Sequence, residues 1–417
     1  MKINRRKFIL GSAVSAFKIS PLLAKNISQS ANIVIVGGGW GGLSAAKTLK
    51  KLNFSYKVTL VEKEDNFISC PISNWVIGQI KQMEDITFTY DKFAKNNDIN
   101  LLKKQISYID RKKRKIFFDK DFIYYDFLIL SPGVDLDYTA IDGYNHNFIS
   151  GWKAGKETRL LSEQVRQLEN NQKFLISVPL SPYRCPPGPY ERASLIASYI
   201  KTKKLKSKVV ILDANQKIVS KGNLFKRAWT ELYTDIIEYH PSSNVIEVNE
   251  KEKKVFTDFD EYTYSFANII PQQKAANLLF TSNLIEPGRR WAKVNPYNLS
   301  SIIDSNIFII GDSIDASSLG NVPKSGYIAY SMGKACGYAV HNTLLGKDPP
   351  SPSFINTCYS LVSNKEGISV SAVYKFDKEK KKIISISQAK GLSPKRSQLV
   401  AENAWGWAIS IWFDMLS

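Results

Sequence analysis

Cysteine is scarce in this 417-residue sequence, with only 4 residues, so each one can be examined individually. No C-x-x-C-H motif occurs, and the chain therefore attaches no c-type haem of its own. After Ala31 no segment reaches the roughly 20 uninterrupted apolar residues of a membrane span. We therefore expect a soluble mature chain with no stable membrane insertion, and any haem must belong to another subunit.

The first 31 residues differ in character from the rest. The stretch "NRRKFILGSAVSAF" places Arg5 and Arg6 before a modest apolar run, and small residues follow. This order is typical of a twin-arginine export signal, which predicts a signal at residues 1–31 and a periplasmic mature protein. The alternative is a basic tail that stays on the protein.

Positive charge is in excess, with a formal net charge of +19. The lysines are scattered among Asn and Ile, and runs such as "DRKKRK" and "EKEKK" are typical of solvated hairpin turns. We therefore expect no nucleic-acid binding, although a basic field attracts anions and acidic partners.

The segment "ANIVIVGGGWGGLSAAKTLKKL" predicts a strand, a glycine turn and a helix. Gly37, Gly39 and Gly42 have the G-x-G-x-x-G spacing, which lets a pyrophosphate approach the start of a helix. The next strand, "YKVTLVEKE", ends in Glu62, which is placed to bind the hydroxyls of an adenosine ribose. Together these features predict a dinucleotide site.

Two later segments favour FAD as the dinucleotide. In "YYDFLILSPGVD" a strand runs into a turn at Gly133, and in "NIFIIGDSID" a strand runs into Gly311 and Asp312. Flavoproteins with two dinucleotide-binding domains carry such a pair, and the aspartate meets the ribityl chain of FAD. From residue 32 to about residue 345 the chain resembles that superfamily.

The second dinucleotide domain of such proteins would lie near residues 152–273. The strand "KFLISVP", the helix "ERASLIASYIK" and the strand "KVVILD", which ends at Asp213, keep the expected order. The loop "LSPYRCPPGP" between them has one glycine and four prolines, and proline has no N–H to donate. We therefore expect no nicotinamide nucleotide to bind there.

This loop instead carries Cys185. Prolines stiffen the turn, and the positive end of the following helix would stabilise a thiolate. A redox partner for this thiol has three candidates, Cys70, Cys336 and Cys358. Cys336 lies in a helix of small residues, where packing is the simpler interpretation.

Four motifs carry a closer resemblance: "SCPISNWVIG", "YRCPPGPYERAS", "PKSGY" and "NTCYSLVSNKEGISV". Through them the chain is similar to the flavoprotein subunit of flavocytochrome c sulfide dehydrogenase over essentially the whole mature length. The resemblance implies that Cys70 is the covalent attachment point of FAD and that Cys185 and Cys358 form a redox disulfide beside the flavin. It further implies that Glu191 moves protons near that disulfide.

Other interpretations of the same residues remain open. The pair Cys185 and Cys358 could be a structural staple in an exported protein, and Cys70 an ordinary buried thiol. Lys324, Ser325 and Gly326 open a helix whose positive end would favour an anionic reduced flavin, but they could also form a simple helix start.

The predicted fold class is α/β, with two Rossmann-like dinucleotide-binding domains of the FAD/NAD-linked reductase type and a C-terminal α+β domain. We place an FAD-binding domain at residues 32–140 and 278–350, a central domain without an NAD loop at 141–277, and the C-terminal domain at 351–417. Tryptophans in the C-terminal tail, Trp405, Trp407 and Trp412, are expected to pack at a domain or subunit interface.

Three functions are compatible with these features. The first is FAD-dependent oxidation of hydrosulfide to sulfur or polysulfide, with electrons passed to a c-type cytochrome that is either a subunit or a soluble protein. The second is a non-catalytic or accessory flavoprotein that binds sulfur compounds. The third is an NAD(P)H-linked disulfide reductase, which the missing glycine loop disfavours. No metal site is predicted.

Overall fold

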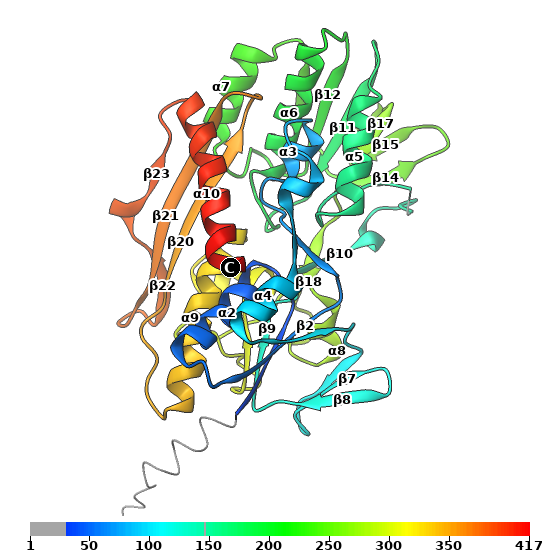
Figure 1. Cartoon of the computed structure of the whole chain (residues 1–417). Helices are drawn as coiled ribbons and strands as arrows, with labels where there is room; N and C mark the ends of the chain where they lie inside the picture. Colours follow the sequence, from blue (N-terminus) through cyan, green and yellow to red (C-terminus); the bar gives the residue numbers. More distant parts are fainter. Residues whose placement is uncertain (1–30, 146) are drawn as a thin grey trace, which may run out of the picture.

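The computed structural model describes residues 31–145 and 147–417. The predicted export signal, including Arg5 and Arg6, lies outside the described residues except for Ala31. The described chain forms two parallel sheets flanked by helices, an antiparallel C-terminal sheet and several smaller antiparallel sheets. Figure 1 shows their arrangement. The predicted fold class is confirmed.

The first domain is built on a five-stranded parallel sheet in the order β19-β9-β1-β2-β5. Its strands are β1 (Asn32–Val36), β2 (Lys57–Glu62), β5 (Asn100–Lys103), β9 (Phe127–Leu130) and β19 (Ile307–Ile309). Four of these strands, all except the edge strand β5, are rich in buried Val, Ile, Leu and Phe, as expected for a parallel sheet that is covered on both faces.

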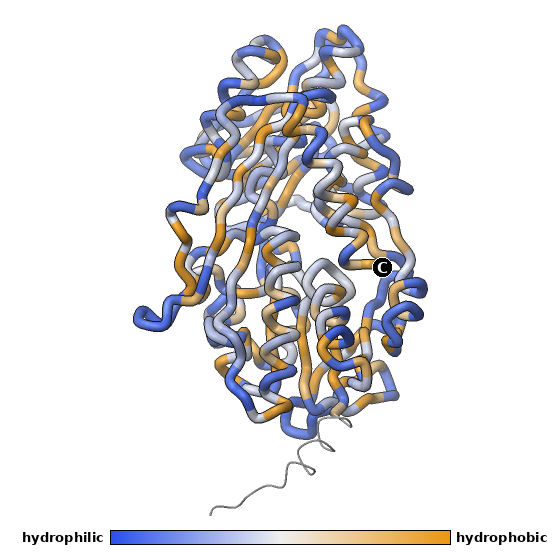
Figure 2. The backbone as a smooth tube through the Cα atoms, turned by 60° about the vertical axis from the view of Figure 1, so that its left-hand side comes forward, coloured by the Kyte–Doolittle hydropathy of each residue, from blue (hydrophilic) through white to orange (hydrophobic). Residues whose placement is uncertain are grey.

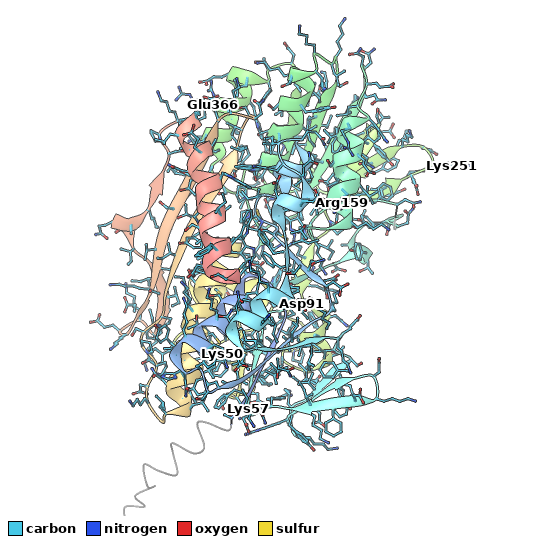
Figure 3. The ribbon with its side chains drawn as sticks, in the orientation of Figure 1. Lys50, Lys57, Asp91, Arg159, Lys251 and Glu366 are labelled. Atoms are coloured by element: carbon cyan, nitrogen blue, oxygen red, sulfur yellow. The ribbon has the colours of Figure 1, made fainter. Side chains whose placement is uncertain are left out.

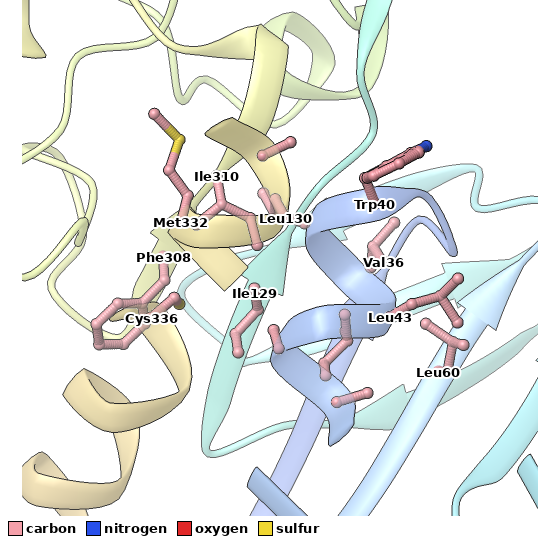
Figure 4. Packing of buried hydrophobic residues seen from close by; sticks show 14 of the residues in the cluster. Val36, Trp40, Leu43, Leu60, Ile129, Leu130, Phe308, Ile310, Met332 and Cys336 are labelled. Atoms are coloured by element: carbon pink, nitrogen blue, oxygen red, sulfur yellow. The ribbon is translucent and has the colours of Figure 1, made fainter. Parts of the chain in front are cut away.

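Helices α2 (Trp40–Leu52) and α9 (Gly326–Leu344) pack closely against each other in this domain. Glycine permits this contact, because a Cβ on Gly333 would lie 2.3 Å from the carbonyl oxygen of Gly41. Cys336 follows on the same helix and is buried in the core near Phe308, as Figure 4 shows. Its position agrees with the packing interpretation of this thiol.

Smaller elements complete the first domain. They are β3 (Asn66–Ile68), α3 (Ser73–Ile77), β4 (Thr87–Thr89), α4 (Tyr90–Asn97), β6 (Tyr108–Asp110), β7 (Lys115–Phe118), β8 (Asp121–Tyr124), β10 (Val134–Leu136), β18 (Gln273–Ala275) and α8 (Asn277–Thr281). Strands β10 and β18 pair where the chain enters and leaves the central domain. Helix α3 reaches away from the first sheet and packs against α5 (Lys156–Arg166) and α6 (Gly188–Thr202).

The central domain has a four-stranded parallel sheet in the order β13-β12-β11-β17. Its strands are β11 (Lys173–Val178), β12 (Lys208–Asp213), β13 (Ile237–Pro241) and β17 (Phe266–Asn268), and α7 (Gly222–Leu232) lies between β12 and β13 in the chain. An antiparallel sheet of β14 (Val245–Asn249), β15 (Lys254–Thr257) and β16 (Glu261–Thr263) is added to it.

Both predicted charged turns join antiparallel strands. "DRKKRK" spans the β6–β7 turn, and "EKEKK" spans the β14–β15 turn. Figure 3 shows Lys251 at the outer end of the second hairpin, and Figure 2 shows hydrophilic residues at the exposed turns.

The C-terminal segment forms an antiparallel sheet of β20 (Ser353–Leu361), β21 (Gly367–Asp377), β22 (Lys382–Ser385) and β23 (Gly391–Leu392), followed by α10 (Gln398–Leu416). Helix α10 contacts this sheet and also α2 and α4 of the first domain. Trp407 stacks on Trp40 with ring centroids 5.8 Å apart, and the Trp412 indole donates to Ser69 Oγ at 3.1 Å. The tail tryptophans therefore pack at a domain interface.

Candidate functional site

The predicted glycine turn lies between β1 and α2, and its geometry leaves little room for side chains. A Cβ on Gly42 would lie 1.9 Å from the carbonyl oxygen of Gly37, whose own φ is +95°. At Gly39, by contrast, a Cβ would meet no atom within 4 Å. The turn is therefore tight on its protein side and open over Gly39.

The start of α2 beside this opening is suited to a phosphate. Gly39 is the N-cap and supplies no side chain to the first N–H groups of the helix. Glu62 at the end of β2 accepts a hydrogen bond from Gly38 N at 2.7 Å, so the acid lies against the glycine turn. These residues fit the pyrophosphate and ribose of a dinucleotide.

The second half of the predicted flavin site lies at the ends of β9 and β19. Gly133 has φ +75° and open space at its Cβ position, and Ser313 Oγ donates to its carbonyl oxygen. The Asp312 side chain is buried and makes no hydrogen bond within the described residues. Burial raises the pKa of Asp312, while the positive charges of Arg184 and Lys324 lower it. A buried carboxylate whose hydrogen-bonding capacity is unused within the described residues fits the ribityl hydroxyls of FAD.

Cys70 lies in the loop between β3 and α3. Ser73 N and Ser73 Oγ both donate to the Cys70 carbonyl oxygen, at 3.1 and 2.7 Å. Ile72 has φ +78°, which is an outlier for a β-branched residue. A Cβ on Gly326 would lie 3.0 Å from the Pro71 ring, which places this loop at the start of α9.

The predicted helix start at Lys324, Ser325 and Gly326 is confirmed, since Ser325 is the N-cap of α9 and accepts from Ile328 N. The Lys324 ammonium donates to the carbonyl oxygens of Asp312 and Ile314. Burial lowers the pKa of Lys324 to about 8. Lys324 thus fastens α9 to the turn that carries Asp312.

Cys185 lies in the turn before α6. Its φ of +55° is in the left-handed region, where stability alone favours glycine. Two backbone hydrogen bonds of 2.8 Å hold it there, from Cys185 N to the Lys324 carbonyl oxygen and from Gly188 N to the Cys185 carbonyl oxygen. The turn is therefore fastened to the first domain at Lys324, beside the residues suited to FAD.

Cys358 reaches the same place from the C-terminal sheet, in β20 opposite Val370. All four cysteines are free thiols in this structure. Cys358 Sγ lies 3.5 Å from Asn356 Oδ1, which accepts from Ser325 Oγ, and Cys185 N donates to the carbonyl oxygen of the adjacent Lys324. Negative charge at Cys358 accordingly raises the pKa of Cys185. Of the three candidate partners, Cys358 is therefore a neighbour of Cys185, whereas Cys336 is buried within α9. The predicted disulfide between Cys185 and Cys358 stays a prediction.

The expected low-pKa thiolate at Cys185 is wrong for the thiol described here. Burial raises its pKa to about 12, and negative charge at Cys358 and Glu191 acts in the same direction. Arg184 and Lys221 lower the pKa but do not compensate for the loss of water. The positive end of α6 therefore does not offset the rise in the Cys185 pKa that burial causes.

Glu191, in the first turn of α6, is buried and accepts three hydrogen bonds. They come from Asn74 Nδ2 at 3.1 Å, Trp75 Nε1 at 3.2 Å and Leu361 N at 2.9 Å. Burial raises the pKa of this carboxyl group. Glu191 thereby joins α3, α6 and β20, and its predicted proton-carrying role stays a prediction.

Sequence reasoning missed three cationic residues of this site. Arg184 and Arg192 lie in the "YRCPPGPYERAS" motif, which was the available signal for them. Burial lowers the pKa of Arg184, but negative charge at Cys70, Asp312 and Cys185 outweighs burial. The net shift of the Arg184 pKa is therefore upward. Arg192 is buried and donates to Asn74 Oδ1, Asn268 Oδ1 and two backbone carbonyl oxygens.

The third missed cation is Lys221, immediately before α7. Its ammonium donates to the Cys358 carbonyl oxygen at 3.0 Å and to Ser360 Oγ at 2.9 Å. Nothing in the sequence around Lys221 distinguishes it from the other lysines.

At the end of β12 an NAD site would need a carboxylate that is free to bind the nucleotide, but here the carboxylate is already bound by protein groups. Asp213 is fully buried and accepts from the hydroxyls of Tyr190 and Tyr239 at 2.7 and 2.9 Å, and from Asn215. Because Tyr190 belongs to the first turn of α6, it also occupies the region that a pyrophosphate would approach. The geometry therefore disfavours nicotinamide nucleotide binding.

Across residues 31–145 and 147–417, no group of three or more His, Cys, Asp or Glu side chains is placed to hold a metal ion. None of the helices in that same part of the chain is long and apolar enough to cross a membrane.

Three family models match the chain. The model for the central part of the sulfide dehydrogenase (flavocytochrome c) flavoprotein chain matches residues 158–271. The flavocytochrome c sulphide dehydrogenase flavin-binding model matches residues 350–416, and the pyridine nucleotide-disulphide oxidoreductase model matches residues 31–176.

Individual relatives agree with these models. A sulfide dehydrogenase (flavocytochrome c) flavoprotein chain from Chlorobaculum thiosulfatiphilum is 57% identical over 44 residues, which are 11% of this chain and 92% of that one. The mitochondrial sulfide:quinone oxidoreductase of Dictyostelium discoideum is 22% identical over 305 residues, 69% of this chain and 66% of the relative. That match spans just under two thirds of the relative's length.

Among solved structures, the sulfide:quinone oxidoreductase of Aquifex aeolicus is similar, with a TM-score of 0.75 and 16% identity. The match covers 93% of this chain and 91% of that one. At this identity the likeness establishes a common fold.

Proposed function

The chain belongs to the family of the flavocytochrome c sulfide dehydrogenase flavoprotein chain, and on that premise we propose that it oxidises hydrosulfide through Cys185 and Cys358 and delivers the electrons to a c-type cytochrome. The observation that carries this proposal is that both cysteines lie beside the first residues of α9, Cys185 through a backbone hydrogen bond to Lys324 and Cys358 through Asn356, which accepts from Ser325. One comes from a left-handed turn fastened to Lys324 and the other from β20, beside residues suited to FAD.

FAD is the cofactor that the first domain fits. The turn at Gly37, Gly39 and Gly42 with Glu62 would hold its pyrophosphate and adenosine ribose, and Asp312 its ribityl chain. Gly133 leaves open space at the end of its strand, Gly311 has the positive φ of +77° that favours glycine, and Cys70 would provide the covalent link.

In the oxidised state the two cysteines would form a disulfide. Hydrosulfide attacks one sulfur, so a new S–S bond forms between the incoming sulfur and the attacked cysteine. The bond between the two cysteines breaks, and the other cysteine leaves as a thiolate. The persulfide and the thiolate then hold the two electrons that hydrosulfide brought.

A bound FAD would supply the two-electron acceptor for this pair, with one-electron transfer onward to a cytochrome haem. The disulfide re-forms, one sulfur atom leaves at the oxidation level of elemental sulfur, and the proton of hydrosulfide is released. Glu191 is proposed to move that proton. The turn around Cys185 keeps the attacked bond in one geometry, which favours exchange.

The proposed location is the periplasm, reached through the twin-arginine segment at residues 1–31. Export of the folded protein would suit a chain that binds FAD first. Replacing Arg5 and Arg6 by Lys should retain the protein in the cytoplasm, and normal periplasmic yield would contradict this part of the proposal.

The decisive experiment adds sulfide anaerobically to the purified protein and records the flavin spectrum, then reduction of cytochrome c and of a soluble quinone in parallel. We expect flavin bleaching and faster reduction of the cytochrome. Cys185→Ser and Cys358→Ser should each abolish sulfide-driven reduction while FAD stays bound, and Cys336→Ser should not, because Cys336 is buried within α9.

The outcomes separate the alternatives. A quinone reduced much faster than cytochrome c would indicate a quinone-linked enzyme, which is what the name of the Dictyostelium discoideum relative describes for that protein. Full activity in a Cys185 or Cys358 variant would show that the two cysteines have only a structural role. Rapid bleaching by NADH would revive the reductase function that Asp213 and Tyr190 disfavour.

A further inference from the structure

Lys221 is a buried cation whose surroundings contain no carboxylate ion-pair partner within the described residues. The residue is 7% exposed, and its ammonium donates to the Cys358 carbonyl oxygen and to Ser360 Oγ, both uncharged acceptors. Within the described residues the third N–H of the ammonium has no acceptor. A buried charge with neutral partners is costly unless a negative charge comes near it.

The backbone at Lys221 points to a role for its side chain. Lys221 has φ +57°, in the left-handed region that favours glycine or asparagine on grounds of stability. Cys185 adopts the same conformation at φ +55° on the other side of the site. Two strained residues that are not glycine thus present a thiol and an ammonium to one place, and strain of this kind clusters at functional sites.

The negative charge that acts most strongly on Lys221 is at the Cys358 sulfur, ahead of the Glu191 carboxylate and Cys185, and the hydrogen bond to the Cys358 carbonyl oxygen holds the ammonium beside that residue. We propose that Lys221 is a positioning residue that holds the anionic form of the Cys358 sulfur, as thiolate or persulfide, once the disulfide has opened. This inference rests on the proposed function for its place in turnover, but the charge it assigns is a property of the reduced protein alone.

The other groups that face Cys358 support this assignment. Asn356 Oδ1 lies 3.5 Å from Cys358 Sγ and accepts from Ser325 Oγ, so this side offers no charge. Glu191 of α6 and Cys185 would bring negative charge, and Tyr374 of β21 is a neutral neighbour whose pKa is raised by burial. Lys221 is therefore the cation of the described residues that faces Cys358.

The directions of the pKa shifts agree with this geometry. Burial raises the pKa of Cys358, and Lys221 is the strongest influence that lowers it. Conversely, burial lowers the pKa of Lys221, and negative charge at Cys358 is the strongest influence that raises it. At Cys185 the effect of Lys221 is smaller than that of Arg184.

The test measures Cys358 in the reduced, FAD-loaded protein without turnover. Alkylation of Cys358 by iodoacetamide is followed by peptide mass spectrometry from pH 6 to 10 in wild type, Lys221→Met, Lys221→Arg and Lys226→Met. Lys226 is the matched control because it is an exposed lysine on α7. We expect Lys221→Met to slow alkylation of Cys358 at pH 8 about tenfold, as a rise of one pKa unit would, and Lys221→Arg to restore most of it.

The readouts distinguish charge from structure. Ser360→Ala removes one acceptor of the ammonium but no charge, so alkylation of Cys358 should stay within about twofold of wild type, since the net effect of one hydrogen bond is small. If Lys221→Met does not retain FAD, Lys221→Gln takes its place. An unchanged pH profile for Cys358 in either variant would overturn the proposal.

Turnover is measured separately. If sulfide does not reduce the wild-type flavin, the proposed function fails, but the alkylation result still decides the role of Lys221. If it does, Lys221→Met should lower kcat for sulfide-driven cytochrome reduction by about the factor seen in alkylation, with partial recovery in Lys221→Arg. Equal kcat in wild type and Lys221→Met would overturn the proposal.

Discussion

The Glu191 carboxylate is the point where three elements are tied together, and its replacement has a cost that can be worked out. It accepts from Asn74 and Trp75 of α3 and from the backbone of Leu361 in β20, all in buried surroundings. Glu191→Ala would leave three buried donors without this acceptor. At about 1–3 kcal/mol for each, the loss is on the order of 3–9 kcal/mol. That approaches the entire stability of a typical domain, about 5–15 kcal/mol.

Glu191→Gln is the sharper perturbation because it keeps the shape. The amide oxygen can still accept from Trp75 and Leu361, but its NH2 group then faces the NH2 group of Asn74. Rotating the Asn74 amide does not help, because Asn74 Oδ1 already accepts from Arg192 Nε at 3.1 Å. One donor conflict therefore remains, with an expected cost of about 1–3 kcal/mol.

The assay is urea unfolding followed by tryptophan fluorescence, with Glu379→Gln as the control because Glu379 is exposed. We expect the midpoint to fall for Glu191→Gln and to stay unchanged for Glu379→Gln. A Glu191→Gln protein as stable as wild type would refute the reasoning, since it would mean that the three hydrogen bonds do not depend on a carboxylate. The pH dependence of sulfide turnover then tests the proton-carrying role. If Glu191 moves the proton, the part of the wild-type rate profile that follows the titration of Glu191 should be absent in Glu191→Gln.

Three further predictions concern the cofactor site and the thiol. Gly42→Ala should prevent flavin binding, because its Cβ would lie 1.9 Å from the Gly37 carbonyl oxygen. Gly39→Ala should fold and only weaken flavin binding, since no protein atom lies within 4 Å of the added Cβ. The flavin-to-protein ratio and the circular dichroism of both variants check this. Flavin should stay with the polypeptide after acid denaturation and be released from Cys70→Ser; yellow colour entirely in the wild-type supernatant would contradict the covalent link. Burial raises the pKa of Cys185 from 9.0 to about 12, so the reduced folded protein holds this proton more tightly than the unfolded chain. The contribution of this protonated thiol to the free energy of unfolding should be complete below pH 9 and be lost as the pH rises toward 12. The difference in unfolding free energy between reduced wild type and Cys185→Ser should therefore shrink over this range. A constant difference would show that the folded state does not raise this pKa.

Local patterns in the sequence determined the elements and much of the cofactor site. The apolar run before Gly37 predicts β1, the glycine spacing predicts the turn into α2, and the charged runs predict hairpin turns; the structure has all of them. The start of α9 at Ser325 was predictable because an N-cap acts on N–H groups only three residues away. These features depend on neighbours along the chain, so the sequence alone was sufficient.

Only the tertiary structure decided what surrounds the cysteines. Cys358 and Lys221 are 137 residues apart in sequence, and their contact exists because β20 packs beside the start of α7. The same packing places Leu361 N against Glu191. The folded surroundings of Cys185 raise its thiol pKa, where the helix end alone predicted a fall. Electrostatic effects depend on distance and on the exclusion of water, both of which are set by the folded chain, and a pattern of neighbouring residues does not contain them.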